Sequence, residues 1–295
     1  MEKITQHSKC PLCNSTNISN YMEVKDYFFT QEMFSLSICK ECKFVFTNPV
    51  PSNLSKYYET TEYFSHNTSA NGVLGKLYST LRNINIKRKY KLVKKYNKSG
   101  SILDIGCGTG ELLSFFKKNN WKTKGIEPNI SARTFARENY DLEIEQEKAL
   151  STYEPKSFDV ISMWHVLEHV PDMHERIKRV SELLKDDGTA YIALPNLNSP
   201  DSKKYGNYWS ALDVPRHLYH FTQQTFNKLS SLNNMKIIHA EPMKFDSYYV
   251  SMLSEKYKNN SMYFLSALIS GTISNLKANK NNNFSSMIYV VKKIS

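Results

Sequence analysis

Ser101-Ile-Leu-Asp-Ile-Gly-Cys-Gly-Thr-Gly110 is the stretch of this 295-residue chain that decides its fold. The first half is a short apolar strand, and the second half is a turn with three glycines that opens into a predicted helix at 111–119. Glycine has no Cβ, so the backbone can turn sharply and approach a ligand closely. The N-terminus of the helix adds free N–H groups and a favourable dipole. The stretch therefore predicts a ligand-binding strand, turn and helix.

Strands and helices alternate on the C-terminal side of this turn. Further strands are expected at 122–126, 158–163, 189–194, 235–239 and 286–292, and helices at 131–139, 174–184 and 222–232. Alternation of this kind is typical of a parallel sheet that helices cover on both faces. We therefore expect a doubly wound α/β domain, and the length leaves room for a smaller module beside it.

The spacing of the glycines separates two kinds of cofactor. A dinucleotide fold uses G-x-G-x-x-G, whereas this chain has G-x-G-x-G with Asp104 two positions before Gly106. A carboxylate disfavours a neighbouring pyrophosphate, but it suits S-adenosylmethionine, which carries an ammonium group and a sulfonium and no phosphate. The second strand ends at Glu127, where a carboxylate can accept hydrogen bonds from both ribose hydroxyls. Glu127 is therefore the predicted ribose ligand.

Four motifs, in this order, resemble those of class I S-adenosylmethionine-dependent methyltransferases. They are Asp104 to Gly110, Glu127, Trp164-His-Val-Leu-Glu-His169 and Pro195-Asn196, and the resemblance covers about residues 85–240 and the final strand. It implies a methyltransferase with a Rossmann-like, seven-stranded sheet whose last strand, at 287–291, is antiparallel. The cofactor-contacting positions that follow are Asp104, Gly106, Cys107, Gly108, Gly110, Glu127, Trp164, His165 and Glu168.

Two assignments within this region stay open. The acidic position that meets the adenine in this family is ambiguous here, and Glu147 is one option. His165 and His169 are four residues apart and would lie on one face of a helix, which could indicate a metal. One further ligand would be missing, so packing at the cofactor cleft is the favoured interpretation. Cys107 is expected to fill space inside the glycine turn.

A long irregular stretch, at 196–220, follows the fifth strand and is predicted to face the methyl acceptor, because ligands bind beyond the C-terminal ends of parallel strands. We expect His217 to act as a general base that Asp213 orients. Tyr208, Trp209, Arg216 and His220 are the predicted acceptor-binding residues. The alternative is that His217 and His220 cap or pack the following helix.

The segment Pro215-Arg-His-Leu-Tyr-His-Phe-Thr222 resembles bacterial methyltransferases of polysaccharide and secondary-metabolite pathways. This resemblance implies a sugar or another small metabolite as acceptor, and an anionic or nucleotide-linked acceptor would suit the basic chain. We expect O-methylation rather than C-methylation. Similar sugar C-methyltransferases carry an N-terminal four-cysteine module but also an additional C-terminal domain, which this sequence does not show.

Residues 1–50 are predicted to form a zinc-ribbon-like module. Cys10-Pro-Leu-Cys13 and Cys39-Lys-Glu-Cys42 are two C-x2-C pairs separated by 25 residues. Four thiolates make a closed tetrahedral site for a structural Zn²⁺. A metal-free set of cysteines is the alternative. Another open option is that the module covers the active site with Tyr27, Phe28 and Phe29.

The remaining expectations concern organisation and partners. Residues 51–98 should form a helical linker or lid, with a loop at 65–75 and a basic helix at 77–96, before a methyltransferase domain at 99–295 with a helical insertion at about 246–280. The insertion could cover the acceptor, form a homodimer interface or touch a membrane. The net charge of +11 leaves an RNA or protein methyltransferase as the alternative, although nucleic acid binding is disfavoured. The absence of a secretory signal and of a spanning segment predicts a cytoplasmic protein.

Overall fold

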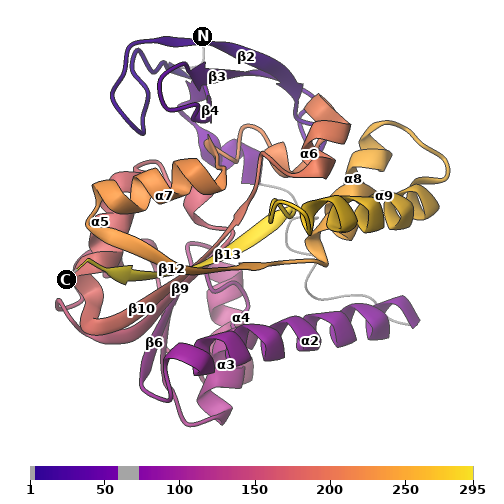
Figure 1. The fold of residues 1–295 in the computed structure, drawn as a ribbon. Helices are drawn as coiled ribbons and strands as arrows, with labels where there is room; N and C mark the ends of the chain where they lie inside the picture. Colours follow the sequence, from indigo (N-terminus) through magenta and orange to yellow (C-terminus); the bar gives the residue numbers. More distant parts are fainter. Residues whose placement is uncertain (1–3, 59–72, 295) are drawn as a thin grey trace.

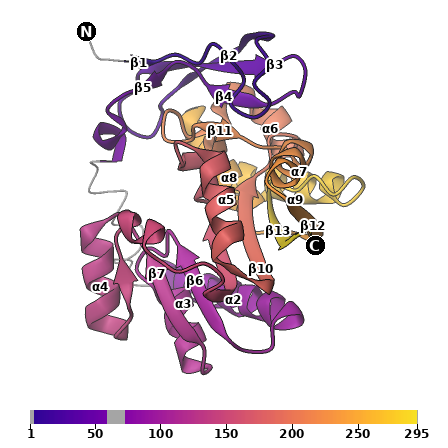
Figure 2. The ribbon, with the colours of Figure 1, turned by 90° about the vertical axis from the view of Figure 1, so that its left-hand side faces the viewer.

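A computed structural model describes residues 4–58 and 73–294 of the chain (Figure 1). Most of the predicted loop at 65–75 and part of the predicted linker at 51–98 lie outside these residues. The described part begins with a small β-rich module, continues through the long helix α2 (Val73–Tyr96) into an α/β sheet, and carries a helical pair near its C-terminus. Figure 2 shows the module at the opposite end of the molecule from α3 (Glu111–Lys118) and α4 (Ile130–Tyr140).

The central sheet has seven strands and the predicted antiparallel last strand. Its order is β12-β13-β10-β9-β6-β7-β8. Strand β13 runs antiparallel to both neighbours, whereas β6, β7, β8, β9 and β10 are parallel. The strand bounds are Met235–Pro242 (β12), Ser286–Lys293 (β13), Leu184–Pro195 (β10), Phe158–Trp164 (β9), Ser101–Ile105 (β6), Lys122–Ile126 (β7) and Ile144–Glu145 (β8). The two-residue strand β8 was not predicted, because it is too short to show a hydrophobic pattern.

Alternation along each strand divides the core between the two faces of the sheet. On β6, Leu103 and Ile105 pack on the face that α5 (Met173–Leu183) and α7 (Gln223–Leu232) cover, whereas Ile102 packs on the face of α2, α3 and α4. Successive side chains of a strand point to opposite faces. The doubly wound fold expected from the sequence is therefore confirmed, and it places the ends of β6, β7 and β9 side by side.

The N-terminal module shares its sheet and its core with the methyltransferase part. Strands β2 (Ile18–Lys25), β3 (Met33–Cys39) and β4 (Val45–Thr47) form an antiparallel sheet, which β11 (Tyr219–His220) completes by pairing with β4. The two-stranded sheet of β1 (Ile4–Thr5) and β5 (Val50–Pro51) lies beside them. The ring of Phe44 packs 5.8 Å from Tyr219 and 5.3 Å from Phe221. Residues beyond 210 therefore belong to the folding unit of the module.

The predicted C-terminal insertion consists of α8 (Asp246–Tyr257) and α9 (Tyr263–Ala278), which pack on α6 (Pro200–Tyr205). Small residues of α9 face inward, and a Cβ on Gly271 would lie 2.6 Å from the ring of Tyr248. The large apolar residues of α9 face outward, namely Phe264, Leu265, Leu268, Ile269, Ile273 and Leu276. A homodimer through the insertion stays a prediction.

Among the helices of residues 4–58 and 73–294, none combines the length and the apolar character that a bilayer-spanning segment needs.

Candidate active site and cysteine cluster

The glycine turn adopts backbone conformations that suit glycine alone. Gly106, Gly108 and Gly110 all have positive φ angles, of 72°, 55° and 82°. A Cβ on Gly106 would lie 2.5 Å from Val166 Cγ2, whereas a Cβ on Gly108 would meet no described atom within 4 Å. The turn is therefore tightly packed at Gly106 and open at Gly108, where a ligand can approach the backbone.

Asp104 and Glu127 place two buried carboxyl groups beside this turn. Asp104 is 2% exposed and accepts a hydrogen bond from Ser162 Oγ at 2.6 Å, and burial raises its pKa to about 7. Glu127 accepts hydrogen bonds from the backbone N–H groups of Gly108 (2.8 Å) and Asn129 (2.9 Å), and burial raises its pKa too. Burial disfavours the charged form of a carboxyl group, so both groups would gain from a cationic ligand at the turn.

The interior of the turn is filled as expected. Cys107 is buried, and its Sγ would lie 2.7 Å from a Cβ on Gly125 of the neighbouring strand β7. This contact explains why the sequence has glycine at 125, since a larger residue would displace the thiol. Cys107 is not part of the cysteine cluster described below.

Lys89 of α2 is a cation at the cofactor edge that the sequence did not single out. Its Nζ lies 4.1 Å from the centroid of the Trp164 ring at the end of β9. Its charge partly offsets the effect of burial on the pKa of Asp104. The sequence placed Lys89 in a run of solvated lysines, and nothing in that run distinguishes the one lysine that turns toward the sheet. Trp164 Nε1 is buried and has no hydrogen-bond partner among the residues that the structure describes.

His165 forms a bridge between β9 and the C-terminal insertion. Its Nδ1 lies 3.3 Å from Glu168 Oε1, and its Nε2 lies 3.3 Å from Asp246 Oδ2 of α8. Burial alone would lower the pKa of His165, but the two carboxylates raise it to about 9. His165 is therefore an imidazolium that anchors α8 beside the predicted cofactor cleft, a role that needs the distant residue Asp246.

Glu168, His169 and His217 come together on the acceptor side of β9. One ligand atom of each lies within 4.8 Å of the other two, and the rings of His169 and His217 meet edge to face with centroids 4.5 Å apart. A backbone hydrogen bond from Leu218 N to Glu168 O, at 2.8 Å, joins the two segments. His217 thus lies beside Glu168 and His169, the residues that follow β9.

The environment of His217 differs from the expected base and orienting carboxylate. Its Nδ1 lies 2.9 Å from the carbonyl oxygen of Ala211, whereas Asp213 Oδ2 is 3.9 Å from Nε2 and beyond hydrogen-bond range. The carbonyl can only accept, so Nδ1 donates and Nε2 is the ring nitrogen that faces away from Ala211. The orienting partner of His217 is thus the Ala211 carbonyl. A sequence cannot show such a partner, because every residue carries a carbonyl.

Arg216 lies in a buried ion-pair network. It is 1% exposed, and its guanidinium contacts Asp26 Oδ1 at 2.8 Å and Asp213 Oδ1 at 2.7 Å. It also donates to the carbonyl of Tyr57 and lies over the ring of Phe28. The predicted role in acceptor binding does not fit this position, because the donors of Arg216 bind Asp213 of the same loop and Asp26 and Tyr57 of the N-terminal part.

The other predicted acceptor residues line this junction. Trp209 is 2% exposed and donates from Nε1 to Asp201 Oδ2 at 2.9 Å. His220 is 3% exposed on β11, and burial lowers its pKa to about 3. Tyr208 is half-buried beside Tyr27, with ring centroids 5.3 Å apart. Of these residues, Tyr208 keeps a surface that an acceptor could reach, whereas Trp209 and His220 are core residues.

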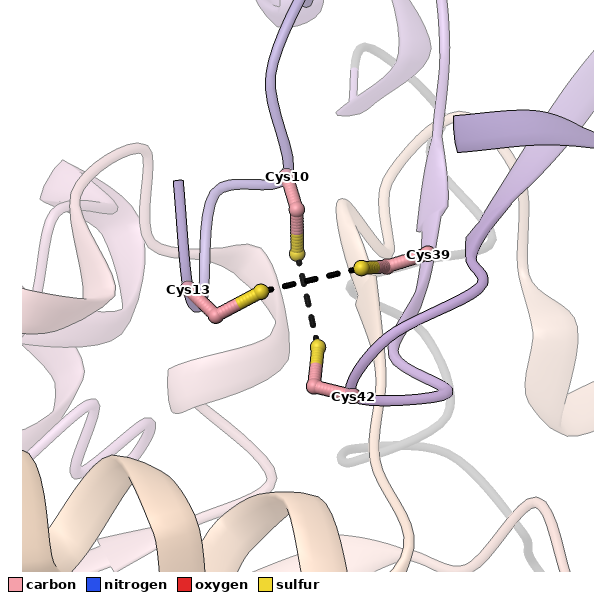
Figure 3. A group of neighbouring side chains, drawn as sticks. All are labelled: Cys10, Cys13, Cys39 and Cys42. Carbon is pink, nitrogen blue, oxygen red and sulfur yellow. Dashed lines mark hydrogen bonds between the residues drawn. The ribbon is translucent and has the colours of Figure 1, made fainter. Parts of the chain in front are cut away.

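The four cysteines of the module converge on one centre. Figure 3 shows their side chains pointing toward one another from two loops. The Sγ atoms of Cys10 and Cys42 are 3.6 Å apart, as are those of Cys13 and Cys39. Four sulfurs at about 2.3 Å from a tetrahedral Zn²⁺ would be roughly 3.8 Å apart, and a disulfide would require about 2 Å. The cluster therefore fits a Zn²⁺ ion.

The sheet order, the glycine turn and the two carboxyl groups at the ends of β6 and β7 define a Rossmann-like methyltransferase. The chain belongs to the family described as "Methyltransferase domain", which matches residues 79–240, more than half of its length. The class inferred from the four sequence motifs is thereby confirmed.

Curated relatives and solved structures agree with this family. A ubiquinone biosynthesis O-methyltransferase of Neisseria meningitidis is 35% identical over 106 residues, which is 33% of this chain and 44% of the relative. The match thus spans less than half the length of that relative. A SAM-dependent methyltransferase of Archaeoglobus fulgidus shares the fold with a TM-score of 0.51 at 18% identity, over 72% of this chain and 94% of the other.

A geranyl diphosphate C-methyltransferase of Streptomyces coelicolor has the same fold, with a TM-score of 0.53 at 11% identity, over 80% of this chain and 86% of the other. At such identities the likeness concerns the fold.

Proposed function

We propose that this protein transfers the methyl group of S-adenosylmethionine to a hydroxyl group of a small molecule. The observation that carries the proposal is the placement of the open glycine turn and the Glu168–His169–His217 group at the ends of neighbouring parallel strands. Ligands of open α/β sheets bind at this edge. The name of the N. meningitidis relative, an O-methyltransferase, supports transfer to oxygen.

The described residues fit the cofactor. Asp104 and the turn at Gly106–Gly110 would hold its methionine end, and Glu127 would accept hydrogen bonds from the ribose. When bound, the cofactor supplies a methyl group on a positively charged sulfur. The raised pKa values of Asp104 and Glu127 indicate that both carboxyl groups lack a full counter-charge in the chain itself. A cationic ligand would provide that charge.

The acceptor hydroxyl would lie against His217. Nε2 is the nitrogen of His217 that the Ala211 carbonyl leaves available, and through this atom we propose that His217 promotes loss of the acceptor proton. Positioning of the hydroxyl in line with the methyl group would supply much of the remaining acceleration. Tyr208 and Tyr27 offer an aromatic wall for an acceptor such as a sugar or another ring compound.

The experiment that tests the proposal begins with calorimetric titration of the full chain with S-adenosylhomocysteine. We expect micromolar binding that Glu127→Ala weakens at least tenfold and that Glu143→Ala, a surface change on the same side of the sheet, leaves unchanged. Radiolabelled methyl transfer to phenols, vicinal diols and nucleotide-linked sugars would then identify the acceptor. Folded wild type that binds no S-adenosylhomocysteine, alone or with these acceptors, would contradict the proposal.

For the cysteine cluster we propose a structural Zn²⁺. Four thiolates leave no open coordination position, and the cluster lies in the module, away from the glycine turn. Metal analysis should find one zinc per chain that Cys39→Ser removes and Cys107→Ser retains. Equal zinc content in both variants would contradict the assignment.

A further inference from the structure

The side chains of Glu168, His169 and His217 face one another, and no hydrogen bond between described residues joins any two of them. Glu168 is fully buried, and neither carboxylate oxygen has a hydrogen-bond partner among the residues that the structure describes. The His165 ring is 3.3 Å away on one side only. A buried carboxylate without hydrogen bonds is costly, so this position calls for a further positively charged partner.

The Nδ1 atom of each imidazole is taken by a carbonyl group. His169 Nδ1 lies 3.0 Å from the carbonyl oxygen of Arg216 and 3.0 Å from the Tyr58 hydroxyl, and His217 Nδ1 lies 2.9 Å from the carbonyl oxygen of Ala211. A carbonyl oxygen accepts only, so both Nδ1 atoms donate, which leaves Nε2 as the atom that each ring can offer to a metal. Metal-binding histidines are oriented in this way, by donating the outer N–H to a carbonyl group.

The ligand atoms of this group converge on one point. One ligand atom each of Glu168, His169 and His217 lies within 4.8 Å of the other two. The two imidazole rings meet edge to face, with centroids 4.5 Å apart. Asp213 Oδ2, 3.9 Å from His217 Nε2, adds a second carboxylate at the edge of the group. A divalent cation would satisfy all of these acceptors at once.

We propose that Glu168, His169 and His217 bind a divalent transition-metal ion. Two imidazoles and one carboxylate favour ions such as Mn²⁺, Fe²⁺, Co²⁺ or Zn²⁺ over Ca²⁺ or Mg²⁺. The sequence left such a site one ligand short, with His165 and His169 as its candidates. In the structure His165 contacts Asp246 and is not part of the group. The ligands beside His169 are Glu168 and His217, which comes from the distant loop.

Three protein ligands leave coordination positions open. On the basis of the proposed function, these positions would take the oxygen of the acceptor hydroxyl, and a neighbouring second oxygen if the acceptor carries one. A bound cation lowers the pKa of a coordinated hydroxyl group, which is how His217 would promote loss of the acceptor proton without accepting it. The proton would pass to solvent, and the bond between sulfur and the methyl group would break as the bond between oxygen and the methyl group forms. The site therefore selects acceptors with two adjacent oxygen atoms, such as vicinal diols.

Mn²⁺ is the probe that separates this site from the cysteine cluster, because carboxylate and imidazole ligands suit it better than four thiolates. Titration of zinc-loaded full chain, followed by the electron paramagnetic resonance signal of free Mn²⁺, should show one bound ion per chain. The measurement needs no cofactor and no acceptor, so failure of the proposed function and failure of this site are distinguishable.

Three variants remove one ligand atom each and keep the local contacts. His169→Asn and His217→Asn retain an amide N–H for the carbonyl group and lack Nε2, and Glu168→Gln keeps the shape of the side chain. Each should weaken Mn²⁺ binding by more than the 10–100-fold typical of an outer-shell partner. His239→Ala, a half-exposed histidine of β12, is the matched control and should leave binding unchanged.

Folding is checked by circular dichroism and by the zinc content of the cysteine cluster, which all four variants should retain. The proposal is overturned if wild type binds no Mn²⁺ at millimolar concentration, or if folded Glu168→Gln and His217→Asn bind it as wild type does.

Discussion

The cofactor half and the acceptor half of the candidate site are built in different ways. The cofactor half, from Asp104 to Glu127, lies within one strand–helix–strand unit of 24 residues. In the acceptor half, Glu168 and His169 contact the loop that contains His217. Arg216 of the same loop binds Asp26 of the module, which is 190 residues away along the chain. The first half is therefore encoded by neighbouring residues, whereas the second exists only when distant parts of the chain meet.

This difference can be tested by breaking the acceptor half alone. Arg216→Met leaves the buried Asp26 without its charged partner, and removal of one member of a buried ion pair typically costs about 3–5 kcal/mol in free energy of unfolding. Chemical denaturation should show a loss of this size. The double variant Asp26→Asn with Arg216→Met should lose less than the sum of the two single changes, because the unpaired charge is gone.

The surface variant Lys156→Met removes an exposed ion pair with Asp186 and is the control, with little expected change. A loss for Arg216→Met as small as that of the control would show that the module is not held by this network.

The cofactor half can be perturbed without unfolding the protein. Gly108→Ala places a side chain at φ 55° in open space, where the left-handed conformation costs about 1–2 kcal/mol. We expect a folded protein whose affinity for S-adenosylhomocysteine falls at least tenfold, because the new methyl group occupies the open side of the turn. Calorimetry measures the affinity, and thermal unfolding measures the strain.

Gly206→Ala provides a matched control for this change. Gly206 has the same φ of 55° and also meets no described atom within 4 Å, but it lies in the acceptor loop. The ψ of Gly206 is −125°, outside the left-handed helical region, so Gly206→Ala should lower the thermal stability at least as much as Gly108→Ala does, with cofactor affinity unchanged. Equal loss of affinity in both variants would mean that strain, and not contact with the ligand, governs binding.

The smallest expected effect concerns the pH dependence of the cofactor half. Because the pKa of Asp104 is raised to about 7, the group is mostly protonated at pH 6 and mostly ionised at pH 8. The ionised form favours the ammonium group of the ligand, so affinity for S-adenosylhomocysteine should rise about tenfold from pH 6 to pH 8. Asp104→Asn should bind weakly and without this dependence. An unchanged pH profile in Asp104→Asn would place the titrating group elsewhere.

The class of fold and the cofactor turn were predictable because their signals are local. The glycine spacing, Asp104 and Glu127 lie at fixed distances along one unit, and the strand pattern shows which residues face the core. The four cysteines were predictable for the same reason, since two C-x2-C pairs bring four ligands from two short loops. In each case the geometry follows from a few neighbouring residues.

The acceptor side was predicted only in outline. The role of His217 stays a prediction, whereas Arg216 and Trp209, expected at the acceptor, are buried in the core. Arginine and tryptophan in a polar loop indicate binding as readily as packing, and only the position of Asp26 or Asp201 distinguishes the two. Lys89 is a second example. Its neighbours on α2 are also basic, and only its contact with Trp164 in the folded protein distinguishes it from them.

The sequence by itself determined the sheet, the glycine turn with its carboxyl groups and the cysteine cluster, because periodicity and short spacing specify them. The tertiary structure alone decided that β11 completes the sheet of the module, that Arg216 joins the two parts and that Glu168, His169 and His217 meet. These contacts depend on how strands far apart in the chain pair and pack. A one-residue change of register would turn their side chains to the other face.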